Sequence, residues 1–297
     1  MIVIFEIKYV SEGGTAVIGG GEHPLMNATA IDGLGVPDPR HNTVEYSDTA
    51  GQYTTGSKDL ARIITISGDI IGGQAEIEAF YKAIYHEGEL LLTFDLQKRK
   101  IKCRLYSADD LRRYAGCDVS GFTVQFIADN PYFSDFEQTR TYIIKKTDLF
   151  PNTEENGELY VTLPSVATTT VAETELNFIS DIPVYPTIYL LNEGGSATLS
   201  DDSGVLIEIF NSDGERRAKI DLNIATSDGE LITVDLPHRK VISSVSGVIT
   251  NTISDDTVMS DFFLGTGYNK ITAVNRNTAK RITAWLEYSP AYITAVY

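Results

Sequence analysis

The sequence predicts a mainly β protein with one helix, in which an N-terminal α+β domain, residues 1–140, precedes a C-terminal antiparallel β-sandwich, residues 141–297. The 297 residues are 42% apolar, enough for about two hydrophobic cores. Only one segment has the periodicity of an amphipathic helix. The second half consists of short β-branched segments separated by turn dipeptides, a pattern typical of a sandwich or barrel.

The helix is predicted over residues 74–86, where apolar side chains recur every three or four residues before Gly88 ends the pattern. These side chains are Ile77, Phe80, Tyr81, Ile84 and Tyr85. We expect this face to pack in the core, because an aromatic face at helical spacing is far more often core than ligand site. Strands rich in β-branched and aromatic residues are predicted around the helix at residues 62–70, 90–95, 101–106 and 122–127.

Residues 31–41, IDGLGVPDPRH, contain two glycines and two prolines. Gly33 and Gly35 are spaced like the start of a phosphate-binding loop. Pro37 and Pro39 lack the amide hydrogens that such a loop needs, and they prevent a helix from starting there. We therefore interpret the segment as a stiff connection between strands, with backbone freedom at both glycines.

Alternation within residues 98–105, KRKIKCRL, predicts a strand with one cationic face. Lys100, Lys102 and Arg104 point one way, while Ile101 and Cys103 point the other. Two interpretations remain open: a solvated, charged strand face that discourages aggregation, or a subunit interface at which the basic stripe meets the acidic surface of a neighbouring copy. Cys103 falls on the inward face and is expected to be inert core.

From about residue 139 to residue 181 the sequence is polar and rich in turns, so we place the domain boundary near residue 140 and a linker over residues 141–181. Beyond the linker, short strands are predicted at residues 188–191, 205–210, 219–222, 231–236, 271–274 and 282–287. They are separated by Gly194-Gly195, Asp213-Gly214 and Asp228-Gly229, dipeptides that permit positive φ in hairpin turns. Their succession without an intervening helix predicts an antiparallel sandwich.

An excess of acidic residues restricts the partners. Asp and Glu number 41 against 24 Lys and Arg, so the net charge is −17. This charge repels nucleic acid and anionic membranes, and argues against a sequence-specific DNA reader. No apolar run approaches the roughly twenty residues of a membrane span, and the first residues resemble a strand rather than a signal peptide. Two cysteines, Cys103 and Cys117, are too few for a disulfide framework and indicate synthesis in a reduced cytoplasm.

The sequence contains no pattern that predicts a catalytic, cofactor or metal site. The four histidines, His23, His41, His86 and His238, stand singly, without the close partner that a local zinc pair requires. The nucleophile motifs of hydrolases and redox enzymes are missing. Residues 211–215, NSDGE, faintly resemble a calcium loop but lack its remaining ligands, and a hairpin turn explains them better.

Several stretches of the first domain together point to one family. They are residues 31–37 with Arg40, residues 51–53 (GQY), 56–57 (GS) and 62–68 (RIITISG), the helix from Gln74, the strand at Leu90, and residues 122–133 (FTVQFIADNPYF). Over roughly residues 25–135 the chain resembles the N-terminal domain of the distal tail proteins of bacteriophages with long, non-contractile tails. The closing run of strand, acidic residue, proline and aromatic is the most specific part.

Residues 260–271, SDFFLGTGYNKI, resemble the last hairpin of the sandwich that follows in these proteins, with Thr266 where a proline is common. The resemblance implies a galectin-like or carbohydrate-module-like second domain. It further implies a hexameric ring at the tail tip of the virion, made in the host bacterial cytoplasm. Such a ring joins the tail tube protein to the tail-associated tip protein and the receptor-binding protein, and its central channel passes the genome without binding it specifically.

Two other functions compete with this structural, non-enzymatic role. The first is a host cell-wall saccharide-binding module, with Trp285, Tyr288 and Tyr292 as candidate sugar contacts, because saccharide sites expose aromatics beside polar groups. Aromatics at such positions more often pack or mediate subunit contact. The second is a glycoside hydrolase, for which the many acidic residues supply possible carboxylate pairs without indicating which two face each other.

Overall fold

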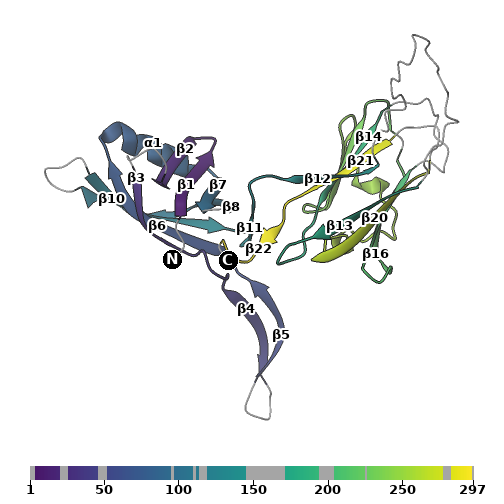
Figure 1. Cartoon of the computed structure of the whole chain (residues 1–297), viewed down its shortest axis with the longest axis horizontal. Coiled ribbons are helices and arrows are strands. Elements are labelled where there is room, and N and C mark those ends of the chain that lie inside the picture. Colours follow the sequence, from purple (N-terminus) through teal and green to yellow (C-terminus); the bar gives the residue numbers. More distant parts are fainter. Residues whose placement is uncertain are drawn as a thin grey trace, which may run out of the picture. The chain divides into compact units, whose positions relative to one another are not determined.

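The computed structural model describes residues 4–20, 26–45, 52–94, 97–109, 112–113, 119–144, 171–193, 204–224, 226–276 and 282–295. It is mainly β with a single α-helix in this part of the chain, which confirms the predicted fold class (Figure 1). The chain divides into two units. The first comprises Met1–Glu137 together with Ala291–Tyr297, and the second comprises Gln138–Pro290.

The first unit is built on one ten-stranded sheet whose main path has the order β2-β1-β7-β8-β10-β6-β3. Its strands are β1 (Ile4–Ser11), β2 (Gly14–Gly20), β3 (Met26–Asp32), β6 (Arg62–Ile71), β7 (Gly88–Phe94), β8 (Lys98–Ala108), β9 (Arg112–Arg113), β10 (Val119–Ala128), β11 (Phe133–Asp135) and β22 (Ala291–Tyr292). The sheet is strongly curved, so that its edge strands approach each other. A Cβ added at Gly19 of β2 would lie only 2.9 Å from the Cβ of Ala28 on β3.

Helix α1 (Gln74–Tyr85) begins where the sequence predicts, ends one residue earlier, and packs its apolar face into the core of the first unit. Phe80 lies in this core, with its ring centroid 5.1 Å from that of Phe122 on β10. Tyr85 was expected on the packed face but is 77% exposed. The reason is geometric: the buried residues Ile77, Phe80, Ala83 and Ile84 share one face, and at about 100° per residue Tyr85 lies outside that face.

Strands β4 (Pro39–Glu45) and β5 (Gln52–Asp59) form a separate two-stranded ribbon. Figure 1 shows the ribbon running out from the first unit. At its base the backbone N–H of Leu60 donates to the carbonyl of Asp38 at 2.9 Å. Neither strand pairs with a third in the described part of the chain, so both outer edges of the ribbon are open.

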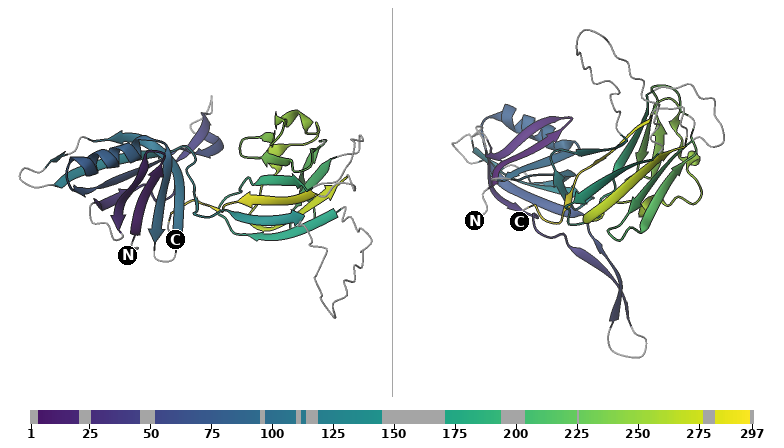
Figure 2. Two further views of the ribbon diagram at one scale, coloured as in Figure 1. Left: turned by 90° about the horizontal axis from the view of Figure 1, so that it is seen from above. Right: turned by 45° about the vertical axis from the view of Figure 1, so that its right-hand side comes forward.

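The second unit is a sandwich of a six-stranded sheet, in the order β12-β21-β14-β17-β18-β19, and a four-stranded sheet, in the order β13-β20-β15-β16 (Figure 2). The first sheet contains β12 (Thr139–Ile144), β14 (Thr187–Asn192), β17 (Leu231–Asp235), β18 (Lys240–Ser243), β19 (Gly247–Val248) and β21 (Ile282–Tyr288). The second contains β13 (Val171–Phe178), β15 (Val205–Phe210), β16 (Arg216–Leu222) and β20 (Gly267–Asn275). The short 3₁₀ helices η1 (Thr250–Thr252) and η2 (Met259–Asp261) lie between β19 and β20. Alternate residues of both sheets are buried in one core.

The division of the chain differs from the expectation at both ends of the second unit. The described parts of the expected linker, residues 141–144 and 171–181, lie mostly in strands β12 and β13, and residues 145–170 lie outside the described residues. Ala291–Tyr297 were expected in the second domain but belong to the first unit. The reason is that β22 pairs with β11 and Ala295 is buried in the core of the first unit.

Candidate interaction surfaces

The basic strand predicted from residues 98–105 is β8, and its cations are paired with acids of the same chain. Lys100 lies 3.6 Å from Glu89, and Lys102 lies 3.1 Å from Glu87. Arg104, on the same face of β8, lies 2.6 Å from Asp129. The stripe is therefore largely neutralised within one copy. The interface role predicted for Lys100, Lys102 and Arg104 stays a prediction.

The inward face of β8 carries a cation that sequence reasoning missed. Arg99 is buried beside Ile101 and Cys103, and its Nη1 lies 2.5 Å from a carboxylate oxygen of Asp135. Its guanidinium lies over the ring of Tyr292, 3.7 Å from the centroid. On the same face, burial raises the pKa of the Cys103 thiol to about 12, so this cysteine is uncharged core as expected.

The glycine- and proline-rich segment, residues 31–41, is bound by a second buried arginine, Arg62. Gly33 has φ +88°, and a Cβ there would lie 2.1 Å from the carbonyl oxygen of Ile63, so only glycine fits. Gly35, by contrast, has open space around the Cβ position. The conformational freedom expected at both glycines is thus required at Gly33 alone. The backbone carbonyls of Gly33 and Gly35 accept hydrogen bonds from Nη1 of Arg62, at 2.7 and 2.5 Å.

Arg62 also binds two other segments of the first unit. Its Nε donates to the carbonyl of Pro131 at 2.6 Å, and its Nη2 donates to the carbonyl of Ile293 at 2.7 Å. The guanidinium lies 4.6 Å from the ring centroid of Phe133 and is 4% exposed. We call this arrangement, Arg62 with the carbonyls of Gly33, Gly35, Pro131 and Ile293, the Arg62 clamp. It joins stretches that the sequence had indicated separately.

Acidic side chains lie near the Arg62 clamp without forming an ion pair with it in the described structure. Burial lowers the pKa of Arg62 to about 10, and the nearby charges of Asp59 and Asp38 oppose that shift. Asp59 accepts a hydrogen bond from the hydroxyl of Tyr132 at 2.7 Å. Burial and this carboxylate raise the pKa of Tyr132 to about 12. The clamp therefore binds backbone oxygens and leaves the carboxylates to other donors.

The second unit contains a smaller arrangement of the same kind. Arg217 lies over the ring of Phe263 at 4.2 Å and donates through Nη2 to the carbonyl of Phe263 and, at 3.3 Å, to Oδ1 of Asn269. Burial lowers the pKa of Arg217. Nearby, the hydroxyl of Thr266 donates to the carbonyl of Ser180. These contacts fix the loop within residues 260–271.

The three candidate aromatics for saccharide contact are divided between the two units. Tyr292 belongs to the first unit, beneath Arg99. Trp285 and Tyr288 point to opposite faces of β21, because they are an odd number of residues apart. Tyr288 is buried in the sandwich core against Phe178. The saccharide role stays a prediction for Trp285, Tyr288 and Tyr292.

Trp285 is flanked on both sides along the outer face of its sheet. On the β14 side, the ring of Tyr189 stacks on it with a centroid distance of 5.2 Å and an interplanar angle of 13°. On the β12 side lie Tyr142, with centroids 6.2 Å apart, and the guanidinium of Arg140, 5.2 Å from the indole centroid. Glu287 accepts hydrogen bonds from Arg140 at 2.8 Å and from the indole N–H at 3.3 Å. A sugar that stacks on a ring face would have to displace one of these neighbours.

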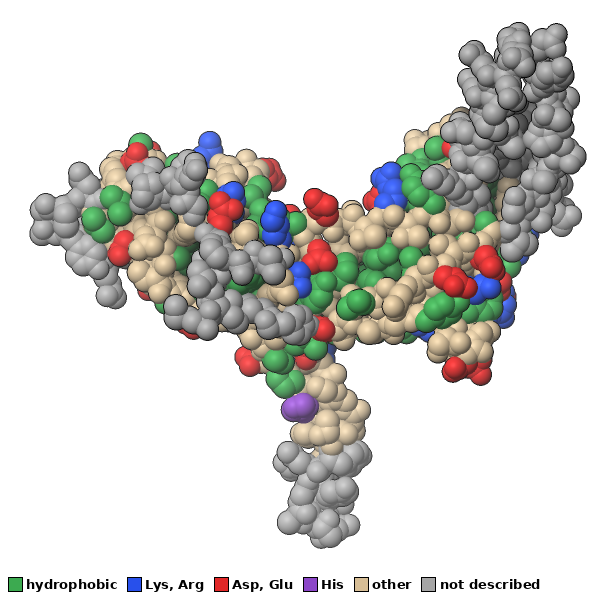
Figure 3. All heavy atoms as spheres, viewed as in Figure 1, with side chains coloured by type: hydrophobic (Ala, Val, Ile, Leu, Met, Phe, Trp, Pro, Cys, Tyr) green, Lys and Arg blue, Asp and Glu red, His purple; other side chains and the backbone are tan. Residues whose placement is uncertain are grey.

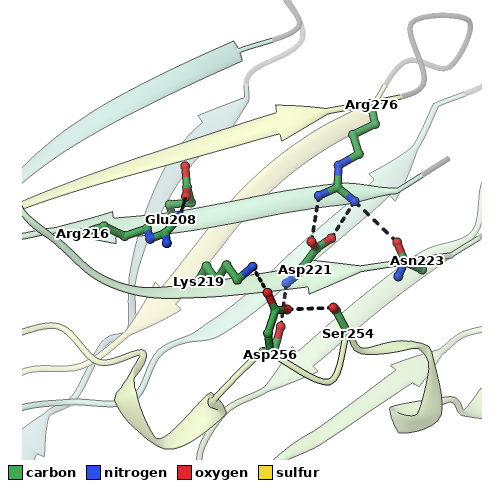
Figure 4. A network of polar contacts seen from close by, with 9 residues as sticks. Glu208, Arg216, Lys219, Asp221, Asn223, Ser254, Asp256 and Arg276 are labelled. Atoms are coloured by element: carbon green, nitrogen blue, oxygen red, sulfur yellow. Dashed lines mark hydrogen bonds and ion pairs between the residues drawn. The ribbon is translucent and has the colours of Figure 1, made fainter. Parts of the chain in front are cut away.

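The outer face of the four-stranded sheet carries a network of paired charges (Figure 4). Arg276 binds Asp221, Lys219 binds Asp256, and Arg216 binds Glu208. Asp256 also accepts a hydrogen bond from Ser254 at 2.7 Å. On the face of the molecule drawn in Figure 3, acidic and basic side chains are likewise interspersed over each unit. Neither view suggests a surface of one sign that would bind a polyanion.

The described part of the chain also shows whether metal-binding clusters, calcium-type loops or membrane-spanning helices are present in it. Its residues contain no group of three or more His, Cys, Asp and Glu side chains that could hold a metal ion. Asn211 sits in a hairpin turn, where its Oδ1 accepts the backbone N–H groups of Asp213 and Glu215 at 3.0 and 2.9 Å, and Gly214 has φ +77°. The described helices include none long and apolar enough to span a membrane. His23 and Cys117 lie outside the described residues.

The fold is similar to that of phage tail-tip proteins. The crystal structure of the Dit (gp19.1) protein of phage SPP1, described as a paradigm of the hub adsorption apparatus in Gram-positive infecting phages, matches with a TM-score of 0.64 and 10% identity, covering 97% of this chain and 99% of that one. Chains of the phage P2 baseplate in its activated conformation match with TM-scores of 0.51 (with Ca, 9% identity) and 0.50 (with Sr, 8% identity). Each match covers 95% of this chain and 97% of the baseplate chain.

No protein-family model and no curated protein matches the sequence. The similarity to solved structures, at about one-tenth identity, concerns the fold. It extends over both units, so the resemblance to distal tail proteins inferred from the sequence is confirmed at the level of the fold.

Proposed function

We propose that this protein is a structural hub of a phage tail tip, in which identical copies close into a ring between the tail tube and the tip proteins. The observation that carries the proposal is the fold match over 97% of the chain to the SPP1 hub protein. A fold supports many functions, so the proposal also has to agree with the surfaces of this chain. Its role is non-catalytic, and its place is the virion.

The β4–β5 ribbon supports self-assembly. An isolated two-stranded ribbon is marginally stable in water and needs a further packing partner. Here both edges of the ribbon are open, and its described side chains are mostly exposed, including Val44 at 43%. A second copy of this chain would supply the packing surface that the first unit itself does not supply in the described structure.

The ring follows from the symmetry of such contacts. A heterologous contact repeated by one kind of subunit either closes into a ring or grows into a filament. The resemblance to distal tail proteins supplies the number six. Mass measurement in solution, combined with low-resolution imaging of the purified protein, tests this directly. A discrete oligomer with a central opening supports the proposal, and a protein that stays monomeric at high concentration contradicts it.

A matched pair of valines tests the ribbon. Val44→Asp places a carboxylate on the ribbon, whereas Val10→Asp places one at a comparably exposed position of β1 in the same unit, 37% against 43%. We expect Val44→Asp to lower the oligomeric fraction at least tenfold and Val10→Asp to leave it unchanged. If the two substitutions lowered the oligomeric fraction equally, the ribbon would not be part of the interface.

Passage of the genome requires an opening that does not retain DNA. Tight non-specific binding needs several lysines or arginines free to neutralise phosphates. Here the cations of β8 are paired with acids, and each copy adds a net charge of −17. We expect no mobility shift of duplex DNA at physiological salt. Retardation that disappears as the salt concentration rises would instead place free cations at the opening.

A further inference from the structure

The first unit is interrupted in sequence by the whole second unit, and residues 291–295 return to complete it. We call these residues the strap. Its strand β22 pairs antiparallel with β11, with Tyr292 opposite Phe133 and Ala291 opposite Ser134. Strand β11 in turn pairs with β8, so the strap extends the sheet of the first unit at β11.

Side chains of the strap, as well as its backbone, contact the first unit. The ring of Tyr292 lies under the buried Arg99, and its hydroxyl donates to Asp135 at 3.1 Å, so that Tyr292 closes the Arg99–Asp135 ion pair. Ala295 is fully buried in the core of the first unit. Its backbone N–H donates to the carbonyl of Leu34 at 3.0 Å.

The strap also completes the Arg62 clamp. Nη2 of Arg62 has the carbonyl of Ile293 as its acceptor, while the other nitrogens of the same guanidinium hold Gly33, Gly35 and Pro131. Without the strap, a donor of a fully charged, 4%-exposed side chain would lose its partner. A buried polar group without a partner carries its full desolvation cost, so docking of the strap and closure of the clamp are one event.

From this geometry we infer that the strap is a folding clasp: the first unit closes only after the chain has passed through Gln138–Pro290 and returned to β11. The second unit, whose core is its own, folds without the strap. In an assembly of the proposed kind, a consequence that rests on the proposed function, chains lacking the residues after Pro290 would be kept out of the ring. The clasp itself does not depend on that function.

Hydrogen exchange on the intact full-length protein tests the clasp without any substitution. We expect the amide of Ala295 to exchange at the same rate as core amides of the first unit such as Ile64 and Phe126, because all of them open together. Exchange of the Ala295 amide a hundredfold faster than those of Ile64 and Phe126 would mean that the strap leaves while the unit stays closed, and would overturn the inference.

A pair of alanine substitutions provides the second test. Ala295→Asp puts a carboxylate at a buried strap position, whereas Ala79→Asp puts one on the exposed side of α1 in the same unit. We expect Ala295→Asp to lower protection of β6 and β10 amides at least tenfold, with β14 and β20 amides unchanged and Ala79→Asp without effect. Unchanged β6 and β10 protection in Ala295→Asp would overturn the clasp.

Removing the strap separates the clasp from the ring. A chain stopped after Pro290 should keep protected β14 and β20 amides and lose protection in the first unit, and an added peptide of residues 290–297 should restore it. A truncated chain with full first-unit protection would contradict the clasp. A full-length protein that shows the clasp but stays monomeric would contradict the proposed ring and leave the clasp standing.

Discussion

Arg62 and Arg217 use the same device with very different reach. Each guanidinium lies over a phenylalanine ring; Arg62 donates to four backbone carbonyls, and Arg217 donates to one backbone carbonyl and one side-chain amide oxygen. Arg217 organises one loop, with its acceptors 46 and 52 residues away in sequence. Arg62 joins acceptors that are 27, 29, 69 and 231 residues away. In the first unit a single guanidinium thus joins segments far apart in the sequence, whereas Arg217 contacts one loop of the second unit.

Because of this difference, loss of the central arginine contact should destabilise more of the first unit than of the second. Loss of a central contact in the first unit frees several segments at once, because one side chain satisfies all of them. Loss of the equivalent contact in the second unit frees one loop, while both sheets keep their own pairing and core. Substitutions in one unit should therefore lower the stability of that unit alone, and a substitution that destabilises both units equally would contradict this difference.

The largest effect is expected from Phe80→Asp in α1. It buries a carboxylate without a partner and removes an aromatic anchor, which together cost about 3–5 kcal/mol, comparable to much of a domain's stability. Hydrogen exchange and limited proteolysis should then show an unfolded first unit and a resistant fragment with ends near Gln138 and Pro290. The control is Tyr85→Asp on the exposed side of the same helix. Loss of both units together would contradict the division of the chain.

Arg62→Met should have the next largest effect. Methionine keeps contact with Phe133 but leaves four carbonyls without their donor, for an expected loss of about 2–4 kcal/mol in the first unit. Arg62→Lys keeps the charge but lacks the planar fork, so it should recover only part of the loss. Denaturant unfolding followed by first-unit and second-unit exchange measures both variants. Full recovery with lysine would mean that charge, not the fork, matters.

High pH should weaken the first unit before the second. The pKa of Cys103 rises from 9.0 to about 12 by burial, that of Tyr132 from 10.0 to about 12, and burial also raises the pKa of Tyr9. Groups whose pKa is raised by folding stabilise the folded state below the unfolded pKa, and this contribution is lost as pH rises through the folded pKa. Cys103 alone should cost about 1 kcal/mol by about pH 10.

Thermal unfolding monitored separately for each unit between about pH 8 and about pH 11 checks this expectation. Tyr132→Phe removes one of the titrating groups and should flatten the slope for the first unit. A steeper slope for the second unit, in which burial raises the pKa of Tyr189, would contradict the assignment.

Arg217→Met should cost about 1 kcal/mol, in the second unit only, because it removes one cation–π contact and donors to one loop. The neighbouring Arg216→Met is a matched control, since that arginine is exposed and pairs only with Glu208 among the described ion pairs. Denaturant unfolding of the second unit distinguishes them. An effect as large as that of Arg62→Met would break the comparison between the two arginines.

The smallest effect on stability is expected from Lys102→Glu, since an exposed pair such as Lys102–Glu87 contributes about 0–1 kcal/mol and less at high salt. The charge-swapped double variant Lys102→Glu with Glu87→Lys restores the internal pair. If the stripe is a solvated face, Lys102→Glu leaves self-association unchanged and the swap restores stability. If it meets an acidic neighbour, the swap restores stability but not association, and sedimentation at two salt concentrations separates the outcomes.

The spacing of apolar residues predicted the helix and the main strands, and the same alternation also indicates that Arg62 and Arg99 point inward. The helix at residues 74–86 and the strands listed from β-branched runs are present, because side-chain period depends on local backbone geometry. Arg62 has the same parity as Ile64 and Ile66 in β6, and Arg99 has the same parity as Ile101 in β8. A charge at an inward position indicates a buried group that needs partners.

Composition and the spacing of neighbouring residues were enough to predict the class of the fold, the helix, four strands around it, six strands of the sandwich and the acidic balance. Which groups meet was settled by the folded chain: the basic stripe is paired within the chain, Trp285 and Tyr288 point to opposite faces of β21, and residues 291–295 complete the first unit. These contacts could not be predicted from the sequence because many of the hydrogen-bond acceptors are backbone carbonyls. Backbone carbonyls accept the hydrogen bonds of Arg62, and a carbonyl is present in every residue, so no side-chain pattern marks the ones that the fold brings into reach.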